Sequence, residues 1–215
     1  MPDSRTSVLF LIPSLQGGGA ERVIVTLLRH LDRKKFRLSL GVVDSRHAVY
    51  RSGVPEDVEV IDLNCSRVRY AMPKIIRLIW KRRPDVVFST LGHLNLALAI
   101  LRPILPDGVR YIARETIIVS MLPVAYSVPF WWGWAYRSFY GRYDKVICQS
   151  QDMREDLVLN FGFPEEKAIV INNPVDIDQV RKASLEIVTM GIENFYLDDV
   201  NRIELVAAGR LSKQK

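Results

Sequence analysis

Residues 14–23 read SLQGGGAERV, and this stretch decides how the fold begins. An apolar run at residues 8–12 precedes it, and apolar side chains at helical spacing follow over residues 20–31. The pattern predicts a strand, a glycine turn and a helix. Glycines let the backbone approach a ligand closely, and the free N–H groups at a helix N-terminus favour an anion, usually a phosphate. A flexible turn that binds nothing is the alternative.

A dinucleotide-binding turn is the main rival interpretation of this stretch. A G-x-G-x-x-G reading places Arg22 where the third glycine would permit close packing of the helix on the strand, which argues against it. Asp44 ends the second apolar run and takes the place of the acid that binds a ribose. A nicotinamide-dependent oxidoreductase therefore remains open as an alternative function.

Composition indicates a globular protein with anionic partners. The 215 residues are 48% hydrophobic, which is ample for a core, and the formal net charge is +6. Such a charge favours nucleotide phosphates or acidic lipid. Short basic clusters, such as Arg67 and Arg69, are interpreted as solvated loops and helix ends. Since no nucleic-acid-binding motif accompanies them, we expect no nucleic-acid partner.

The cysteines and the N-terminus point to a cytoplasmic protein. Cys65 and Cys148 are isolated, so neither a disulfide framework nor a zinc site is expected. The first residues run almost directly into the first strand, so no signal peptide is expected.

Apolar runs alternate with helical patterns along most of the chain. A helix carries Met72 and Ile79 with Pro73 near its start, residues 94–101 form a buried helix, and Ser150 caps another. This alternation predicts an α/β fold with a Rossmann-like, doubly wound parallel sheet. The predicted later strands, several apolar throughout as in strands buried on both faces, are residues 38–43, 58–61, 86–89, 110–113, 145–148, 168–171 and 203–207.

The sequence changes character after residue 171. Residues 172–178 are rich in turn formers, and a polar stretch follows them. We divide the chain into an N-terminal domain at residues 1–174, a linker at 175–202 and the start of a second domain at 203–215. A strand that ends in a glycine turn should continue into a helix, so we expect the chain to be cut there.

Four pieces of this chain resemble the group 1 glycosyltransferases of family 4, which have the GT-B fold. The pieces lie in the family's order over nearly the whole chain: residues 17–23 (GGGAERV), 148–150 (CQS), 173–176 (NPVD) and 209–215 (GRLSKQK). The resemblance implies that this chain is the N-terminal, acceptor-side half of such an enzyme plus the linker.

The resemblance also implies a site and a mechanism. GT-B enzymes hold a nucleotide sugar between two Rossmann-like domains, and family members retain anomeric configuration without a metal. Gly17, Gly18 and Gly19 would face the donor diphosphate or sugar, and Arg210 and Lys215 would hold the diphosphate. Such donors would stabilise the charge on the departing diphosphate. We expect no cofactor, and we expect this chain alone to be inactive.

Two candidate catalytic residues follow predicted strands. His93 lies just past residues 86–89 and is a candidate to contact the transferred sugar or the leaving phosphate, with a structural histidine as the alternative. Glu115 ends the strand at residues 110–113 and would orient an acceptor hydroxyl as a base, with a salt-bridged glutamate as the alternative.

An aromatic segment follows a charge-free stretch at residues 116–136. The stretch is long enough for a membrane span, but a span would place strands of one sheet on opposite sides of the membrane. We interpret Trp131, Trp132, Trp134 and Arg137 as a membrane or acceptor surface. A helix packed on the sheet is the alternative.

The sequence as a whole predicts a retaining hexosyltransferase at the cytoplasmic face of the membrane. It would transfer sugar from a nucleotide-sugar donor to a glycan or lipid-linked acceptor in cell-surface polysaccharide synthesis, and would attach peripherally to anionic lipid. The nicotinamide-dependent oxidoreductase and a non-catalytic membrane-docking domain remain the alternatives.

Overall fold

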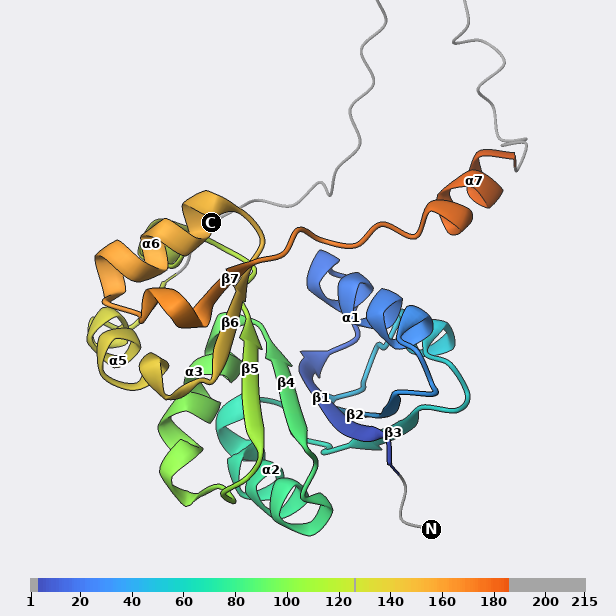
Figure 1. Cartoon of the computed structure of the whole chain (residues 1–215), viewed down its shortest axis with the longest axis horizontal. Coiled ribbons are helices and arrows are strands. Elements are labelled where there is room, and N and C mark those ends of the chain that lie inside the picture. The colour runs from blue at the N-terminus through green and yellow to red at the C-terminus, as the bar shows by residue number, and fades with distance from the viewer. Residues whose placement is uncertain (1–3, 126, 186–215) are drawn as a thin grey trace, which may run out of the picture. The chain divides into compact units, whose positions relative to one another are not determined.

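A single parallel sheet organises the protein. The computed structural model describes residues 4–125 and 127–185, and residues up to Pro174 belong to one compact unit. The sheet order is β3-β2-β1-β4-β5-β6-β7, with all neighbours parallel (Figure 1). The strands are β1 (Thr6–Ser14), β2 (Phe36–Asp44), β3 (Glu59–Asp62), β4 (Val86–Thr90), β5 (Arg110–Arg114), β6 (Lys145–Cys148) and β7 (Ala168–Val170).

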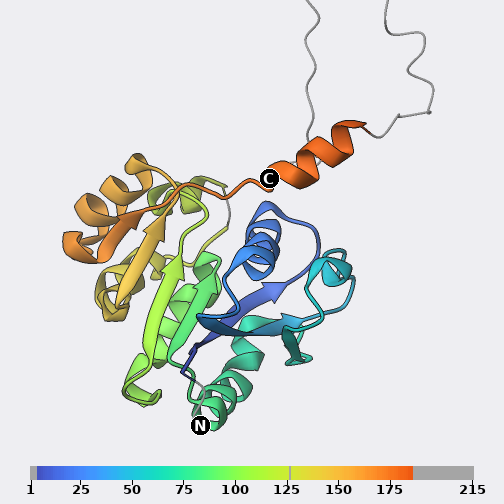
Figure 2. The same cartoon turned by 45° about the vertical axis from the view of Figure 1, so that its right-hand side comes forward.

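Helices connect these strands and cover both faces of the sheet (Figures 1 and 2). The predicted Rossmann-like, doubly wound fold is therefore confirmed. The helices are α1 (Gly19–His30), α2 (Val68–Arg82), α3 (Gly92–Leu101), α4 (Leu122–Ala125), α5 (Trp132–Phe139), α6 (Gln151–Phe161) and α7 (Ile177–Leu185).

Alternation along the central strand separates two cores. Leu9 and Leu11 face the layer of α2, α3, α5 and α6. Val8, Phe10 and Ile12 face α1 on the other side. Because β1 is buried on both faces, it is apolar almost throughout and lacks the alternation of apolar and polar residues that marks a half-exposed strand.

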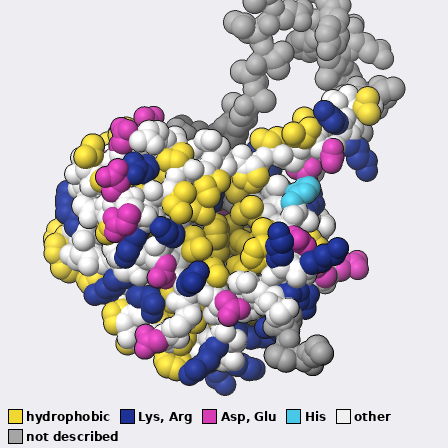
Figure 3. Space-filling view, viewed as in Figure 1, with side chains coloured by type: hydrophobic (Ala, Val, Ile, Leu, Met, Phe, Trp, Pro, Cys, Tyr) yellow, Lys and Arg dark blue, Asp and Glu magenta, His cyan; other side chains and the backbone are white. Residues whose placement is uncertain are grey.

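The face that carries α1 is only partly covered. Phe88, Ile112 and Ile147 line a shallow apolar cavity of about 270 Å³ beside this helix. Figure 3 shows hydrophobic side chains gathered there, over β4 and β5.

The predicted helices are present, with one correction. Ser150 caps α6 by accepting a hydrogen bond from the Met153 N–H at 3.3 Å, and α3 is mostly buried. The helix at Met72 begins earlier than expected, at Val68, so Pro73 lies inside it. Pro73 is exposed, and its ring therefore faces away from the core.

The end of the chain is described only in part. Helix α7 lies within the stretch assigned to the linker and belongs to a second unit, where the Asp176 carboxylate accepts a hydrogen bond from the Gln179 N–H at 3.0 Å. The predicted strand at residues 203–207 lies outside the described residues. In the part of the chain that is described, no helix combines the length and hydrophobicity needed to cross a membrane.

Candidate functional site

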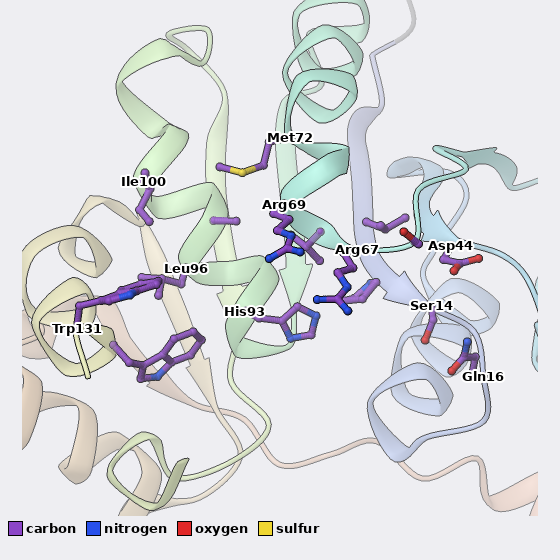
Figure 4. A pocket seen from close by; sticks show the side chains of 16 residues that line it. Ser14, Gln16, Asp44, Arg67, Arg69, Met72, His93, Leu96, Ile100 and Trp131 are labelled. Atoms are coloured by element: carbon purple, nitrogen blue, oxygen red, sulfur yellow. The ribbon is translucent and has the colours of Figure 1, made fainter. Parts of the chain in front are cut away.

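A cleft of about 670 Å³ opens where β1, β2 and β4 end. The strand order reverses between β1 and β4, because β1 pairs with β2 on one side and β4 on the other. Open α/β sheets bind ligands at such a switch point. The cleft wall includes Ser14 at the end of β1 with Gln16 just after it, Asp44 of β2, and His93 after β4 (Figure 4).

The glycine turn adopts a conformation that depends on its composition. Gly17 has a φ of +102°, which side chains disfavour. Gly18 precedes α1, and no side chain caps this helix, so a ligand can reach the N–H groups of its first turn. A Cβ on Gly18 would lie 2.3 Å from Oε2 of Glu21, whereas one on Gly19 would meet nothing within 4 Å.

Glu21 folds back beneath this turn instead of pointing to solvent. Its side chain is buried, and its Oε1 accepts a hydrogen bond of 3.3 Å from the Ser14 hydroxyl. The carboxylate therefore joins the end of β1 to the start of α1. Ser14 and Gln16 line the cleft, while the glycines are not part of its described wall. Their contact with a donor stays a prediction.

The Asp44 carboxylate is engaged within its own loop. The Arg46 guanidinium donates hydrogen bonds to both carboxylate oxygens, at 2.6 Å from Nη2 and 2.9 Å from Nε. These bonds lower the pKa of Asp44 to about 2. The acid that the nicotinamide alternative assigned to a ribose is thus already paired.

Three basic side chains converge at the centre of the cleft. Figure 4 shows Arg67 and Arg69, from the start of α2, pointing toward His93 at the start of α3. Arg69 donates a hydrogen bond of 2.9 Å to the Tyr70 hydroxyl, and Arg67 has no partner among the described side chains. The interpretation of these arginines as solvated residues of loops and helix ends holds, since both are exposed and Arg67 is the N-cap residue of α2, but the fold also places them in the cleft wall. Sequence spacing carried no signal for this.

His93 is the candidate catalytic residue that the structure places in the cleft wall. The ring has access to solvent, and the partial loss of hydration in the cleft lowers its pKa below the ordinary value of 6.5. The turn before it is strained, since Leu91 has a φ of +75°. His93 is therefore presented as a neutral imidazole at neutral pH.

Glu115 does not reach the cleft. Its side chain is 1% exposed, and its Oε1 accepts hydrogen bonds from the Tyr140 hydroxyl and from the Asn95 amide, the latter at 3.0 Å. Burial raises its pKa to about 7. Both expectations for this residue are corrected: the fold removes it from an acceptor hydroxyl, and its described partners are neutral groups. Arg114 instead donates hydrogen bonds to Thr90 and Asn173.

The tryptophans divide into two kinds. Trp131 and Trp134 are 41% and 61% exposed, as a membrane or acceptor surface requires. Trp132 packs on the core, with its ring 5.4 Å from that of Tyr136, so the alternative of core packing holds for this residue. Its indole N–H is buried and has no partner among the described residues.

Trp132 also joins the cleft to a second cavity. The second cavity has a volume of about 520 Å³, and His93 and Trp132 line both this cavity and the cleft. Arg137 is exposed, and its Nε donates a hydrogen bond of 3.1 Å to the Asn160 carbonyl in α6. Arg137 thus links two helices.

Two predicted donor-binding residues cannot be placed. Arg210 and Lys215 lie outside the described residues. Within the described ranges, no group of three or more His, Cys, Asp or Glu side chains could hold a metal ion.

This parallel sheet, with a ligand-sized cleft at its carboxyl edge, is that of a Rossmann-like domain of the GT-B class. Residues 17–179 match Glycosyltransferase Family 4, which is more than half of the 215 residues. The chain therefore belongs to that family, and the resemblance carried by residues 17–23 is confirmed.

Solved structures share the fold at low identity. HepE (Alr3699) of Anabaena, solved with UDP and glucose, has a TM-score of 0.63 at 16% identity, over 84% of this chain and 50% of its own. The lipopolysaccharide outer core galactosyltransferase WaaB has a TM-score of 0.59 at 11% identity, over 79% of this chain and 46% of its own. UDP-GlcNAc 2-epimerase of Neisseria meningitidis has a TM-score of 0.58 at 15% identity, over 86% of this chain and 52% of its own.

The chain thus spans about half the length of the solved structures that it matches. Since an epimerase is among them, their likeness concerns the fold, while the family rests on the sequence match. The comparison with curated proteins gave no match.

Proposed function

We propose that the protein transfers a sugar from a nucleotide-sugar donor to a glycan or lipid-linked acceptor, with retention of anomeric configuration, in cell-surface polysaccharide synthesis. The observation that carries this proposal is the cleft at the β1/β4 switch point, between the glycine turn and His93. HepE, which shares the fold, was solved with UDP and glucose.

Each part of the site has a role in this reaction. The free N–H groups at the start of α1 would bind the donor diphosphate and stabilise its charge as it departs. Arg210 and Lys215 would complete this diphosphate site. Neutral His93 would donate a hydrogen bond to the sugar or to the departing phosphate.

Glu115 has a positioning role in this proposal. It is buried below the cleft and bonds Asn95, which lies two residues after His93 on α3. The carboxylate would therefore hold the start of α3 in place, while proton transfer from the acceptor would be left to groups that reach the cleft.

Association with the membrane is the second part of the proposal. Trp131 and Trp134 are exposed, and the net charge of +6 attracts anionic lipid. Together they support peripheral attachment at the cytoplasmic face. The same observation supports the second candidate function, a membrane-docking domain without catalysis.

A transfer assay on the product of the complete gene separates these functions. The assay supplies radiolabelled nucleotide sugars and measures nucleoside diphosphate release and the anomeric configuration of the product by NMR. Transfer with retention supports the proposal, and residues 1–215 alone should be inactive because catalytic groups must be positioned together. Vesicle binding without turnover of any donor would favour the docking domain instead.

A further inference from the structure

The cleft wall changes character along its length. In Figure 4, Ser14, Gln16 and Asp44 lie at one end, and the basic side chains Arg67, Arg69 and His93 lie in the middle. The other end is apolar, and Leu96, Ile100 and Trp131 form it. A ligand that fills the whole cleft therefore needs an anionic group next to a hydrocarbon part.

The charges at the centre of the cleft favour a strong anion. Arg67 and Arg69 are both exposed, and the nearest balancing acid in the wall, Asp44, is bonded by Arg46. Arginine guanidinium groups match phosphate geometry with paired N–H donors. Helices α2 and α3 also begin here, at Val68 and Gly92, and their N-termini add to the positive potential.

The apolar end is suited to a hydrocarbon chain. Ile100 is 37% exposed although it belongs to a mostly buried helix. Phe130 is fully exposed beside Trp131. Three other apolar side chains near them in the sequence are also exposed, namely Met121, Val124 and Trp134. With these exposed apolar side chains beside it, the apolar end of the cleft would accept a hydrocarbon chain from the membrane interface.

We propose that this cleft binds the acceptor as a lipid phosphate, with the phosphate on Arg67 and Arg69 and the chain along α3 and α5. This inference rests on the proposed function and names the acceptor class. A nucleotide-sugar donor explains the basic centre alone, because it carries no alkyl part to cover the exposed surface of Ile100 and Trp131. The combination of phosphate and chain distinguishes the acceptor from the donor.

Calorimetric titration of the purified chain tests the combination. The probes are n-octyl phosphate below its micelle concentration, inorganic phosphate and 1-octanol. Octyl phosphate should bind at least about tenfold more tightly than either other probe, because each of those engages one half of the cleft. Equal affinity for octyl phosphate and inorganic phosphate would overturn the proposal.

Matched variants locate the two halves. Arg67→Gln and Arg69→Gln should each weaken octyl phosphate binding by about tenfold and leave octanol binding unchanged. Arg77→Gln removes the same charge from an exposed position on α2 and should have no effect. Ile100→Ser should weaken both alkyl probes, whereas Ile104→Ser, exposed just beyond α3, should weaken neither. Equal effects of target and control variants would overturn the assignment.

A competition arm distinguishes acceptor from donor. UDP should not displace octyl phosphate, and displacement by UDP with the same dependence on Arg67 would assign the basic centre to the donor. In the complete protein, sugar transfer to soluble glycans together with absent octyl phosphate binding would refute this inference alone. Absent transfer to every acceptor, with octyl phosphate bound as described, would refute the proposed function alone.

Discussion

The side-chain amide of Asn95 donates a hydrogen bond of 3.0 Å to Oε1 of Glu115 and joins α3 to the end of β5. The same amide reaches the Arg114 carbonyl at 3.1 Å, and its oxygen accepts a hydrogen bond of 2.8 Å from the Ser89 hydroxyl. Each of these side chains is buried. The start of α3, which presents His93 to the cleft, is thus fixed by groups beneath it.

The Glu115 carboxyl should make stability depend on pH. Its pKa is about 7 in the folded chain against 4.5 for an exposed glutamate, so the unfolded chain releases this proton first as pH rises. As pH rises from about 4.5 to 7, the free energy of unfolding of the wild type should fall by about 3 kcal/mol relative to that of Glu115→Gln. Above pH 7 it should fall no further. Urea unfolding of both proteins at pH 5 and pH 8 measures this. A difference in unfolding free energy between the two proteins that is the same at both pH values would contradict the raised pKa of Glu115.

Substitutions in the glycine turn should separate folding from donor binding. A side chain on Gly19 enters open space, so Gly19→Val should leave the melting temperature unchanged and weaken donor affinity. Gly18→Val should reduce transfer as well, but it must also displace the Glu21 carboxylate and should lower the melting temperature. Calorimetry and donor titration of the complete protein test both. Normal donor affinity in Gly19→Val would show that the turn does not face the ligand.

His93→Ala should slow sugar transfer by roughly two to three decades, the usual effect of losing a transition-state hydrogen-bond donor. Because the partial loss of hydration in the cleft lowers the pKa of His93, the imidazole is neutral at pH 7, and His93→Gln should retain part of the rate through its amide donor. Transfer rates with saturating donor measure the effect. His47→Asn, an exposed loop histidine, is the control. Unchanged turnover in His93→Ala would leave His93 a structural role.

The exposed tryptophans should control vesicle binding. Wild type should sediment with anionic vesicles, and salt should weaken this binding only in part, because the apolar contribution is insensitive to salt. Trp131→Ser/Trp134→Ser should release the protein without unfolding it, whereas Trp132→Ser should lower the melting temperature. Trp80→Ser removes another exposed tryptophan, on α2, and should bind vesicles normally. A wild type that ignores vesicles would refute membrane attachment.

Local physics determined much of the fold from the sequence alone. Strands buried on both faces carry continuous apolar runs, so β1 and β4 were predictable from residues 8–12 and 86–88. The glycines at residues 17–19 and the Ser150 cap act through their immediate neighbours, and both mark helix starts correctly. Strand and helix alternation then leaves few topologies other than a doubly wound sheet.

The tertiary structure decided which side chains share the cleft. Arg67 and His93 are 26 positions apart, and they meet only because α2 and α3 begin at the same edge of the sheet. Trp131 and Trp132 are neighbours in different environments: Trp131 is exposed just before α5, whereas half-buried Trp132 packs against the core. Glu115 follows its strand as a catalytic base would, yet α3 and α5 cover it. Burial and long-range contact depend on how elements pack, and no local pattern encodes them.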